Sequence, residues 1–128
     1  MERNGDDAPP TMKARLTYVI KFVADMDKAV RFHRDILGLT LDFASSGWSE
    51  FKTGDVRLAL HPATSENPPG SVELGYGIDD LMAVYQKRER LGLSSLQKPK
   101  AMRGRLLSTF LDCENVPCRI SGPLHDKR

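Results

Sequence analysis

Residues Phe22–Leu41 read FVADMDKAVRFHRDILGLTL and carry the clearest structural signal in the chain. Asp25 suits a helix N-cap, because its side chain can accept a hydrogen bond from the free backbone N–H groups of a first turn. Gly38 suits the helix end. Between them, mostly apolar residues recur at helical spacing on one face, namely Met26, Ala29, Val30, His33, Ile36 and Leu37. The pattern predicts a helix from Asp25 to Gly38, with His33 packed in the core.

Strand patterns flank this predicted helix. β-branched and aromatic residues predict a strand over 16–23, and three short strands over 39–44, 48–52 and 56–61 follow the helix. The turn sequences SSG and TGD separate the last three strands. The first half of the chain is therefore predicted to be a βαβββ unit.

The second half repeats this order. Residues 75–93 read GYGIDDLMAVYQKRERLGL, and one constant offset pairs Asp25 with Asp79 and Gly38 with Gly92. Matches at one offset on cap, helix face and terminal glycine indicate a duplicated supersecondary unit. The second unit is predicted as a strand at 72–78, a helix at 80–91, and strands near 93–96, 106–111 and 117–121.

The 128 residues are enough for one domain, which we predict at 14–123. Proline, glycine and acidic residues without a period predict a solvated arm at the start. The predicted parts are an arm at 1–13, module one at 14–61, a linker at 62–70, module two at 71–123 and a tail at 124–128.

Composition narrows the function classes. The net charge of +2 is too small to indicate nucleic acid or an anionic membrane as partner, and no nucleic-acid-binding motif is present. No apolar run reaches the roughly 20 residues of a membrane span, and the start has no secretion pattern. Two cysteines, Cys113 and Cys118, make no disulfide framework and are expected to stay reduced. We expect a cytoplasmic protein.

The two helix motifs, together with GWSEFKTGDVRLALHPA at 47–63, resemble the vicinal oxygen chelate superfamily, which includes glyoxalases, bleomycin-resistance proteins and extradiol dioxygenases. The resemblance covers residues 16–123. It implies an α+β fold of two tandem βαβββ modules whose curved mixed sheets enclose a cavity. It also implies that, if the protein is an enzyme, it is a glyoxalase-like lyase or a dioxygenase-like enzyme.

The resemblance places the usual metal ligands at Tyr18, Ala59, Glu73 and Arg119. A phenol with a pKa near 10 is a poor ligand at neutral pH, alanine has no donor atom, and a guanidinium repels cations. Glu73 is the one suitable residue, and alternation adds His61 as a second weak candidate. A catalytic metal ion needs about three protein ligands, so no metal cofactor is expected. Binding of a divalent ion is kept as the alternative.

Strand alternation extends these positions into a predicted ligand-binding set, to which Trp48 is added although its face is unassigned. The set is Tyr18, Ile20, Phe22, Trp48, His61, Glu73 and Arg119. The residues that alternate with these along the strands, such as Leu60 and Leu74, point to the other face and are expected to pack beneath helices. The structural alternatives are a buried Glu73–Arg119 ion pair and a solvated His61 at a strand end.

The leading hypothesis is a metal-independent protein that binds a small organic molecule, anionic or amphipathic. Lys98–Arg105 would be a mobile loop that attracts an anion. The alternatives are a metal-dependent glyoxalase-like lyase or dioxygenase with unusual ligands, and a structural or interaction dimer. The resemblance and the exposed edges of small sheets both favour a homodimer.

Overall fold

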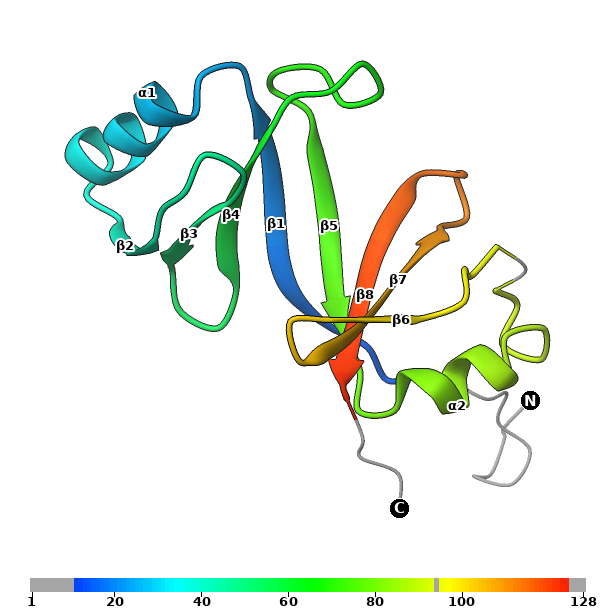
Figure 1. Cartoon of the computed structure of the whole chain (residues 1–128). Helices are drawn as coiled ribbons and strands as arrows, with labels where there is room; N and C mark the ends of the chain where they lie inside the picture. The colour runs from blue at the N-terminus through cyan, green and yellow to red at the C-terminus, as the bar shows by residue number, and fades with distance from the viewer. Residues whose placement is uncertain (1–10, 94, 125–128) are drawn as a thin grey trace, which may run out of the picture. The chain divides into compact units, whose positions relative to one another are not determined.

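The computed structural model describes residues 11–93 and 95–124 (Figure 1). The chain divides into two compact units. Leu16–Tyr76 form the amino-terminal unit, and Gly77–Arg128 with the segment before Leu16 form the carboxy-terminal unit. Most of the predicted arm and tail falls outside the described residues. The predicted module boundaries stay a prediction.

The amino-terminal unit contains β1 (Arg15–Val23), α1 (Met26–Arg31), a π-helical turn η1 (Phe32–Ile36), β2 (Thr40–Phe43), β3 (Ser49–Lys52), β4 (Arg57–Pro62) and β5 (Val72–Gly77). Its strands lie in the order β2-β3-β4-β1-β5. β1 and β4 are parallel, whereas β3 is antiparallel to both β2 and β4. All the predicted elements of the first βαβββ unit are confirmed with slightly shifted ends, although the helix changes to π geometry after Arg31.

Asp25 caps α1 as predicted, because its Oδ1 accepts a hydrogen bond of 3.0 Å from the Lys28 backbone N–H. The helix then widens, and the Leu37 N–H donates to the Phe32 carbonyl rather than to the His33 carbonyl, which would be its partner in an α-helix. A π turn thus includes an extra residue compared with an α turn. The helical segment ends at Gly38, which has a φ of 74°.

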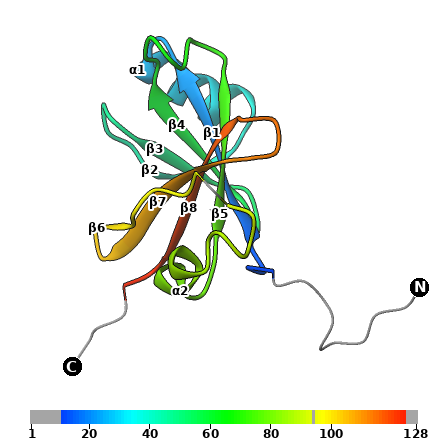
Figure 2. The ribbon, with the colours of Figure 1, turned by 90° about the vertical axis from the view of Figure 1, so that its right-hand side faces the viewer.

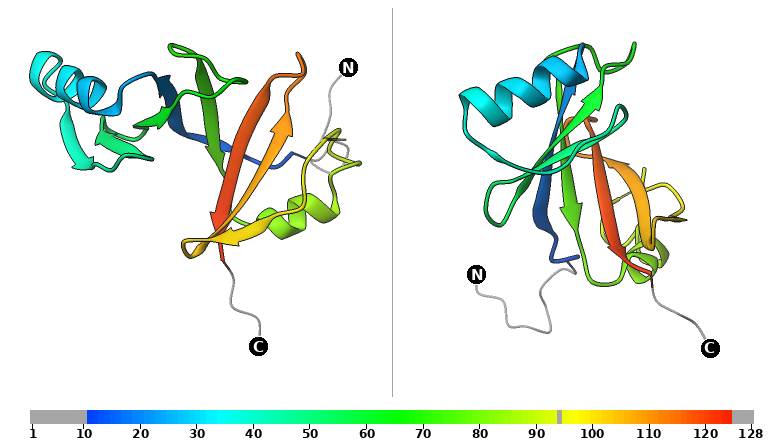
Figure 3. Two further views of the ribbon diagram at one scale, coloured as in Figure 1. Left: turned by 45° about the horizontal axis from the view of Figure 1, so that its top comes forward. Right: turned by 60° about the vertical axis from the view of Figure 1, so that its left-hand side comes forward.

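α1 lies against one face of the amino-terminal sheet (Figure 3). Val30, Phe51 and Leu60 form the buried core on this face, with Phe51 and Leu60 at 0% exposure. His33 is buried as predicted, because its Nδ1 lies 2.8 Å from the Ala29 carbonyl oxygen and its ring packs on Phe51. Leu74 is exposed, so the expectation that it lies beneath a helix was wrong.

The carboxy-terminal unit contains α2 (Leu81–Gln86), β6 (Lys100–Met102), β7 (Arg105–Leu111) and β8 (Pro117–Pro123). α2 lies beside β8 (Figures 1 and 2). A Cβ at Gly122 would meet the Ile78 carbonyl oxygen at 3.0 Å, so only glycine permits this close approach. β7 pairs with both β6 and β8 in antiparallel register. The element order βαβββ is thus confirmed in both halves.

The helix predicted at 80–91 begins as expected but ends early. Its cap is Asp80, whose Oδ1 accepts from the Ala83 N–H at 3.1 Å, so the match of the Asp25 cap with Asp79 was wrong by one residue. The segment from this cap to Gly92 is therefore shorter than the segment from Asp25 to Gly38, where the π turn takes up the extra residue. α2 also ends at Gln86, and hydrogen-bonded turns replace the rest of the predicted helix to residue 91.

The strand predicted at 93–96 was wrong as well. The Leu96 N–H donates to the Leu93 carbonyl in a turn, and the strand that pairs with β7 is β6, which begins only at Lys100. β6 and β7 are joined by a tight turn, Arg103–Gly104, in which both residues have positive φ. The predicted mobile loop at Lys98–Arg105 is therefore largely a β-hairpin.

Among the described residues, no helix is long and apolar enough to span a membrane. The cytoplasmic location stays a prediction.

Candidate functional site

The amino-terminal sheet has one face that α1 does not cover, and the strand register defines its residues. Directly paired residues lie on the same face of a sheet. The register therefore places three rows across β1, β4 and β3. These rows are Tyr18, Arg57 and Lys52; Ile20, Ala59 and Glu50; and Phe22 and His61, with Trp48 just before β3. We call this surface the open face.

Buried apolar residues form the floor of the open face. Ile20 and Phe22 are 2% and 1% exposed, and Ala59 is fully buried. Tyr18, Trp48 and Ala63 pack against this floor and are themselves half-buried. The structure therefore brings Tyr18, Ile20, Phe22 and Trp48 together, and it assigns the face of Trp48 that the sequence left open. That these residues bind a ligand stays a prediction.

The rings around this floor touch one another. The ring centroids of Tyr18 and Trp48 are 6.0 Å apart, and those of Trp48 and His61 are 6.2 Å apart in an edge arrangement. Phe22 and His61 are 5.1 Å apart. Aromatic pairs at such distances stabilise beyond the area they bury. Tyr18, Trp48 and His61 thus form a continuous row of rings beside the floor, which we call the aromatic wall.

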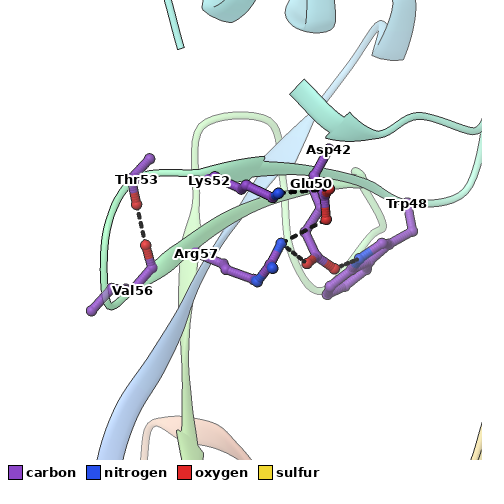
Figure 4. Close-up of polar contacts among 7 residues, drawn as sticks. All are labelled: Asp42, Trp48, Glu50, Lys52, Thr53, Val56 and Arg57. Carbon is purple, nitrogen blue, oxygen red and sulfur yellow. Dashed lines mark hydrogen bonds and ion pairs between the residues drawn. The ribbon is translucent and has the colours of Figure 1, made fainter. Parts of the chain in front are cut away.

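A polar network that the sequence analysis missed borders this wall (Figure 4). Trp48 Nε1 donates to Glu50 Oε1 at 2.8 Å, and Arg57 Nη1 donates to Glu50 Oε2 at 2.9 Å. The same Arg57 nitrogen donates to Asp42 Oδ2 at 2.8 Å, while Lys52 Nζ lies 3.6 Å from Asp42 Oδ1. In the sequence, only the alternation that places Trp48 and Glu50 on one face of their strand indicated part of this network. Asp42 lies on β2, two strands before Arg57, so its contact with Arg57 had no local signal.

Pairing between Asp42 and Arg57 shifts the pKa of both groups. The hydrogen bond from Arg57 lowers the pKa of the Asp42 carboxyl, and the positive charge of Lys52 adds to the effect. The hydrogen bond to Asp42 raises the pKa of Arg57, and the negative charge of Glu50 adds to that effect. Arg57 and Lys52 on the open face are therefore held by carboxylates.

His61 has a defined ring orientation. Its Nδ1 lies 2.7 Å from the Pro62 carbonyl oxygen. A carbonyl oxygen can only accept, so Nδ1 must carry the proton, and Nε2 of the neutral ring is left as the acceptor. This nitrogen is the group on His61 that could bind a ligand's hydrogen-bond donor or a metal ion.

Glu73 is buried at 8% exposure on β5. A Cβ at the neighbouring Gly75 would lie 3.1 Å from Tyr18 Cβ, so Gly75 faces the same side of the sheet as Tyr18. Alternation then places Glu73 on the open face as well. Arg119 lies in the other unit, on β8 opposite Thr109. The predicted Glu73–Arg119 ion pair stays a prediction.

A metal site needs several donor side chains grouped together. Among the described residues, no three or more His, Cys, Asp or Glu side chains are grouped to hold an ion. At the four positions implied by the resemblance, Ala59 has no donor atom and Arg119 is a cation. This donor set does not fit a divalent ion.

Each unit has a surface hollow within the described chain. The larger, of about 430 Å³, lies between α1 and the segment 44–49, and its wall includes Met26, Arg31 and Arg34. The smaller, of about 260 Å³, lies between residues 11–13 and α2. None of the predicted ligand-binding residues lines either hollow.

A family model described as the Glyoxalase/Bleomycin resistance protein/Dioxygenase superfamily matches residues 15–116. No curated protein matches the chain. A solved structure of methylmalonyl-CoA epimerase from Mycobacterium tuberculosis is similar, with a TM-score of 0.67, 18% identity, and coverage of 86% of this chain and 88% of that chain.

Two further solved structures share the fold. A superfamily member from Vibrio splendidus 12B01 has a TM-score of 0.65 at 13% identity, covering 86% of this chain and 99% of that chain. A methylmalonyl-CoA epimerase from Streptomyces coelicolor, in complex with 2-nitronate-propionyl-CoA, has a TM-score of 0.66 at 17% identity, covering 87% of this chain and 98% of that chain. At these identities the similarity concerns the fold.

Proposed function

The chain belongs to the Glyoxalase/Bleomycin resistance protein/Dioxygenase superfamily, and on this premise we propose that it binds a small organic molecule without a catalytic metal ion. The observation that carries the proposal is the aromatic wall over the buried floor of Ile20, Phe22 and Ala59. Ligand sites are commonly apolar surfaces with a few polar groups that orient the ligand. His61 Nε2 and the buried Glu73 would be such groups.

The donor chemistry supports the metal-independent form of the proposal. Ala59 contributes to the apolar floor, at a position where a metal-binding relative would carry a donor. Tyr18 contacts the Trp48 ring with its own ring, so it serves as wall. Structural neighbours include epimerases that act on methylmalonyl-CoA, which makes acyl-CoA compounds one class to include in a ligand screen.

A thermal-shift screen of metabolites, acyl-CoA compounds and antibiotics tests the proposal, with and without a chelator. A ligand at about 100 times its Kd stabilises the native state by about 2.7 kcal/mol. We expect a hit whose stabilisation survives the chelator and falls with Tyr18→Leu. Phe32→Leu is the matched control, because Phe32 is an exposed ring on η1. Stabilisation by no compound, or only with added metal, would contradict the proposal.

The metal-dependent lyase or dioxygenase is the second candidate, and the Nε2 acceptor of His61 is the observation that favours it. It requires His61 and Glu73 to bind the ion with only two protein side chains. Element analysis of freshly purified protein separates the candidates, because stoichiometric Ni, Zn, Mn or Fe supports the second and contradicts the first. His61→Gln should then reduce the metal content.

We also propose a homodimer. β2 and β6 each have one hydrogen-bonded neighbour within their own unit, so their outer edges present backbone groups that another chain could cover. Sedimentation equilibrium at micromolar concentration should give twice the mass of one chain. A single species of monomer mass would contradict this proposal.

A further inference from the structure

The outer edge of β6 is open in the carboxy-terminal unit. Among the strands of the described chain, β6 is hydrogen-bonded to β7 alone. The chain already runs along β7 before β6 begins, because the Gln97 N–H donates to the Thr109 carbonyl at 3.0 Å and Ser108 Oγ donates to the Gln97 carbonyl. All three residues of β6 are exposed. Backbone N–H and C=O groups along such an edge can pair with an added strand.

This edge is basic. Residues 97–111 include four cations, Lys98, Lys100, Arg103 and Arg105, and no Asp or Glu. All four are exposed, and none of them is in an ion pair with another residue that the structure describes. Arg105 Nη2 donates to Ser121 Oγ at 3.3 Å, so its guanidinium lies toward β8 and away from β6. The other three cations supply the positive charge along β6, and we call residues 98–103 the basic edge.

The described carboxylates of this unit lie elsewhere. Asp79 and Asp80 precede α2, and Glu89 follows it. β6 pairs with the beginning of β7, whereas Asp112 and Glu114 come after its end. Within its own unit, the basic edge is therefore a region of positive potential, which favours an anionic partner. Lysine on an edge strand also hinders pairing with a second copy of the same edge.

Alternation sorts the side chains along β6. Lys100 and Met102 share one face, whereas Ala101 lies on the other face with its paired residue, the buried Leu106. A strand added outside β6 places every second side chain beside Lys100, and the side chains between them beside the small Ala101. An extended segment that alternates acidic and small apolar residues thus fits this edge.

We propose that the basic edge binds an acidic, extended segment of a partner protein as an added strand of this sheet. Main-chain hydrogen bonds to β6 supply affinity, and acidic side chains beside Lys98, Lys100 and Arg103 select the partner. Pro99 has no N–H, so the hydrogen-bonded part of the added strand begins at Lys100. Nucleic acid suits this edge less well, because residues 98–103 include no aromatic side chain on which bases could stack. This inference is independent of the small-molecule site.

The experiment is a titration of the full-length protein with an acetylated and amidated peptide of alternating glutamate and valine, followed by amide chemical shifts. Shifts should saturate and concentrate at residues 100–103, and hydrogen exchange of the outward-facing amides among them should slow. Lys100→Gln should weaken binding about fivefold, the loss of one cross-strand ion pair. Lys87→Gln is the matched control, because Lys87 is an exposed lysine of the same unit at the end of α2.

Two further comparisons separate strand pairing from simple charge attraction. Lys100→Glu should weaken the peptide more than Lys100→Gln does, because it places two carboxylates side by side. A peptide in which proline replaces the valines should not bind, since proline cannot donate to the ladder. Amide spectra of the free variants confirm folding.

Several results would overturn the proposal. They are the absence of saturable binding, an equal loss with Lys87→Gln, equal binding of the proline peptide, or tighter binding of a single-stranded oligonucleotide that Lys100→Gln weakens.

Discussion

The indole nitrogen of Trp48 donates a hydrogen bond of 2.8 Å to Oε1 of Glu50. Trp48 is the single tryptophan of the chain, and its ring also contacts Tyr18 and His61. The second oxygen of Glu50 accepts from Arg57. The position of the aromatic wall is therefore coupled to the charged network beside it, and the fluorescence of this protein reports on the candidate site.

Glu50→Ala is predicted to shift the emission maximum of Trp48 to longer wavelength, because the indole loses its partner and becomes hydrated. The free energy of unfolding should fall by about 1–2 kcal/mol, since Glu50 accepts hydrogen bonds from two side chains. Steady-state fluorescence and urea unfolding measure the two effects. Glu66→Ala is the control, because Glu66 is an exposed residue of the segment between β4 and β5. Unchanged emission would show that the hydrogen bond does not fix the ring in solution.

The Asp42–Arg57 pair predicts an acid-dependent contribution to stability. Arg57 lowers the pKa of Asp42 in the folded state, so the pair stabilises the protein above the unfolded pKa of about 3.9. This contribution is lost as the pH falls through the lowered folded pKa. The difference in unfolding free energy between the protein and Asp42→Asn should therefore be constant above about pH 5 and shrink below about pH 4.

Urea unfolding between pH 3 and 7 measures this difference. Asp55→Asn supplies the comparison, because Asp55 is an exposed carboxylate in the turn between β3 and β4. A difference that grows as the pH falls would contradict the sign of the predicted contribution.

Most of the fold could be predicted from the sequence, because caps, helix-ending glycines and strand alternation are local signals. The predicted strands of the first half and the buried His33 were confirmed for this reason. The strand expected at 93–96 was wrong because two leucines around two serines are compatible with a turn as well as with a strand. The Leu96 N–H donates to the Leu93 carbonyl, so the chain turns there.

The candidate site was predictable to the extent that alternation reports which residues share a face. Tyr18, Ile20 and Phe22 follow from one strand, and the parallel register adds His61. The pairing of Asp42 with Arg57 could not be found in this way, because β3 lies between β2 and β4 and the contact reaches across it. Alternation reports the face of a residue within its own strand, but it does not tell which strands are neighbours or in what register they pair.

Gly75→Ala is predicted to lower the free energy of unfolding by about 1–3 kcal/mol. The added Cβ would lie 3.1 Å from Tyr18 Cβ and 3.9 Å from Ile20 Cδ1, so β1 or the Tyr18 ring must move. Ligand binding at the aromatic wall should weaken with it. Gly47→Ala is the matched control, because its Cβ would meet nothing within 4 Å. Equal stability of the two variants, measured by urea unfolding, would mean that β1 and β5 adjust without strain.

Arg103→Asn is predicted to stabilise the protein by about 1 kcal/mol, because asparagine tolerates positive φ better than arginine. Arg103 has a φ of 54° and Gly104 a φ of 78°, so the turn between β6 and β7 needs positive φ at both residues. Valine tolerates that region worse than either residue, so thermal unfolding should rank Asn above Arg and Arg above Val at this position. A variant with asparagine that is less stable than the protein itself would show that the Arg103 side chain makes a compensating contact.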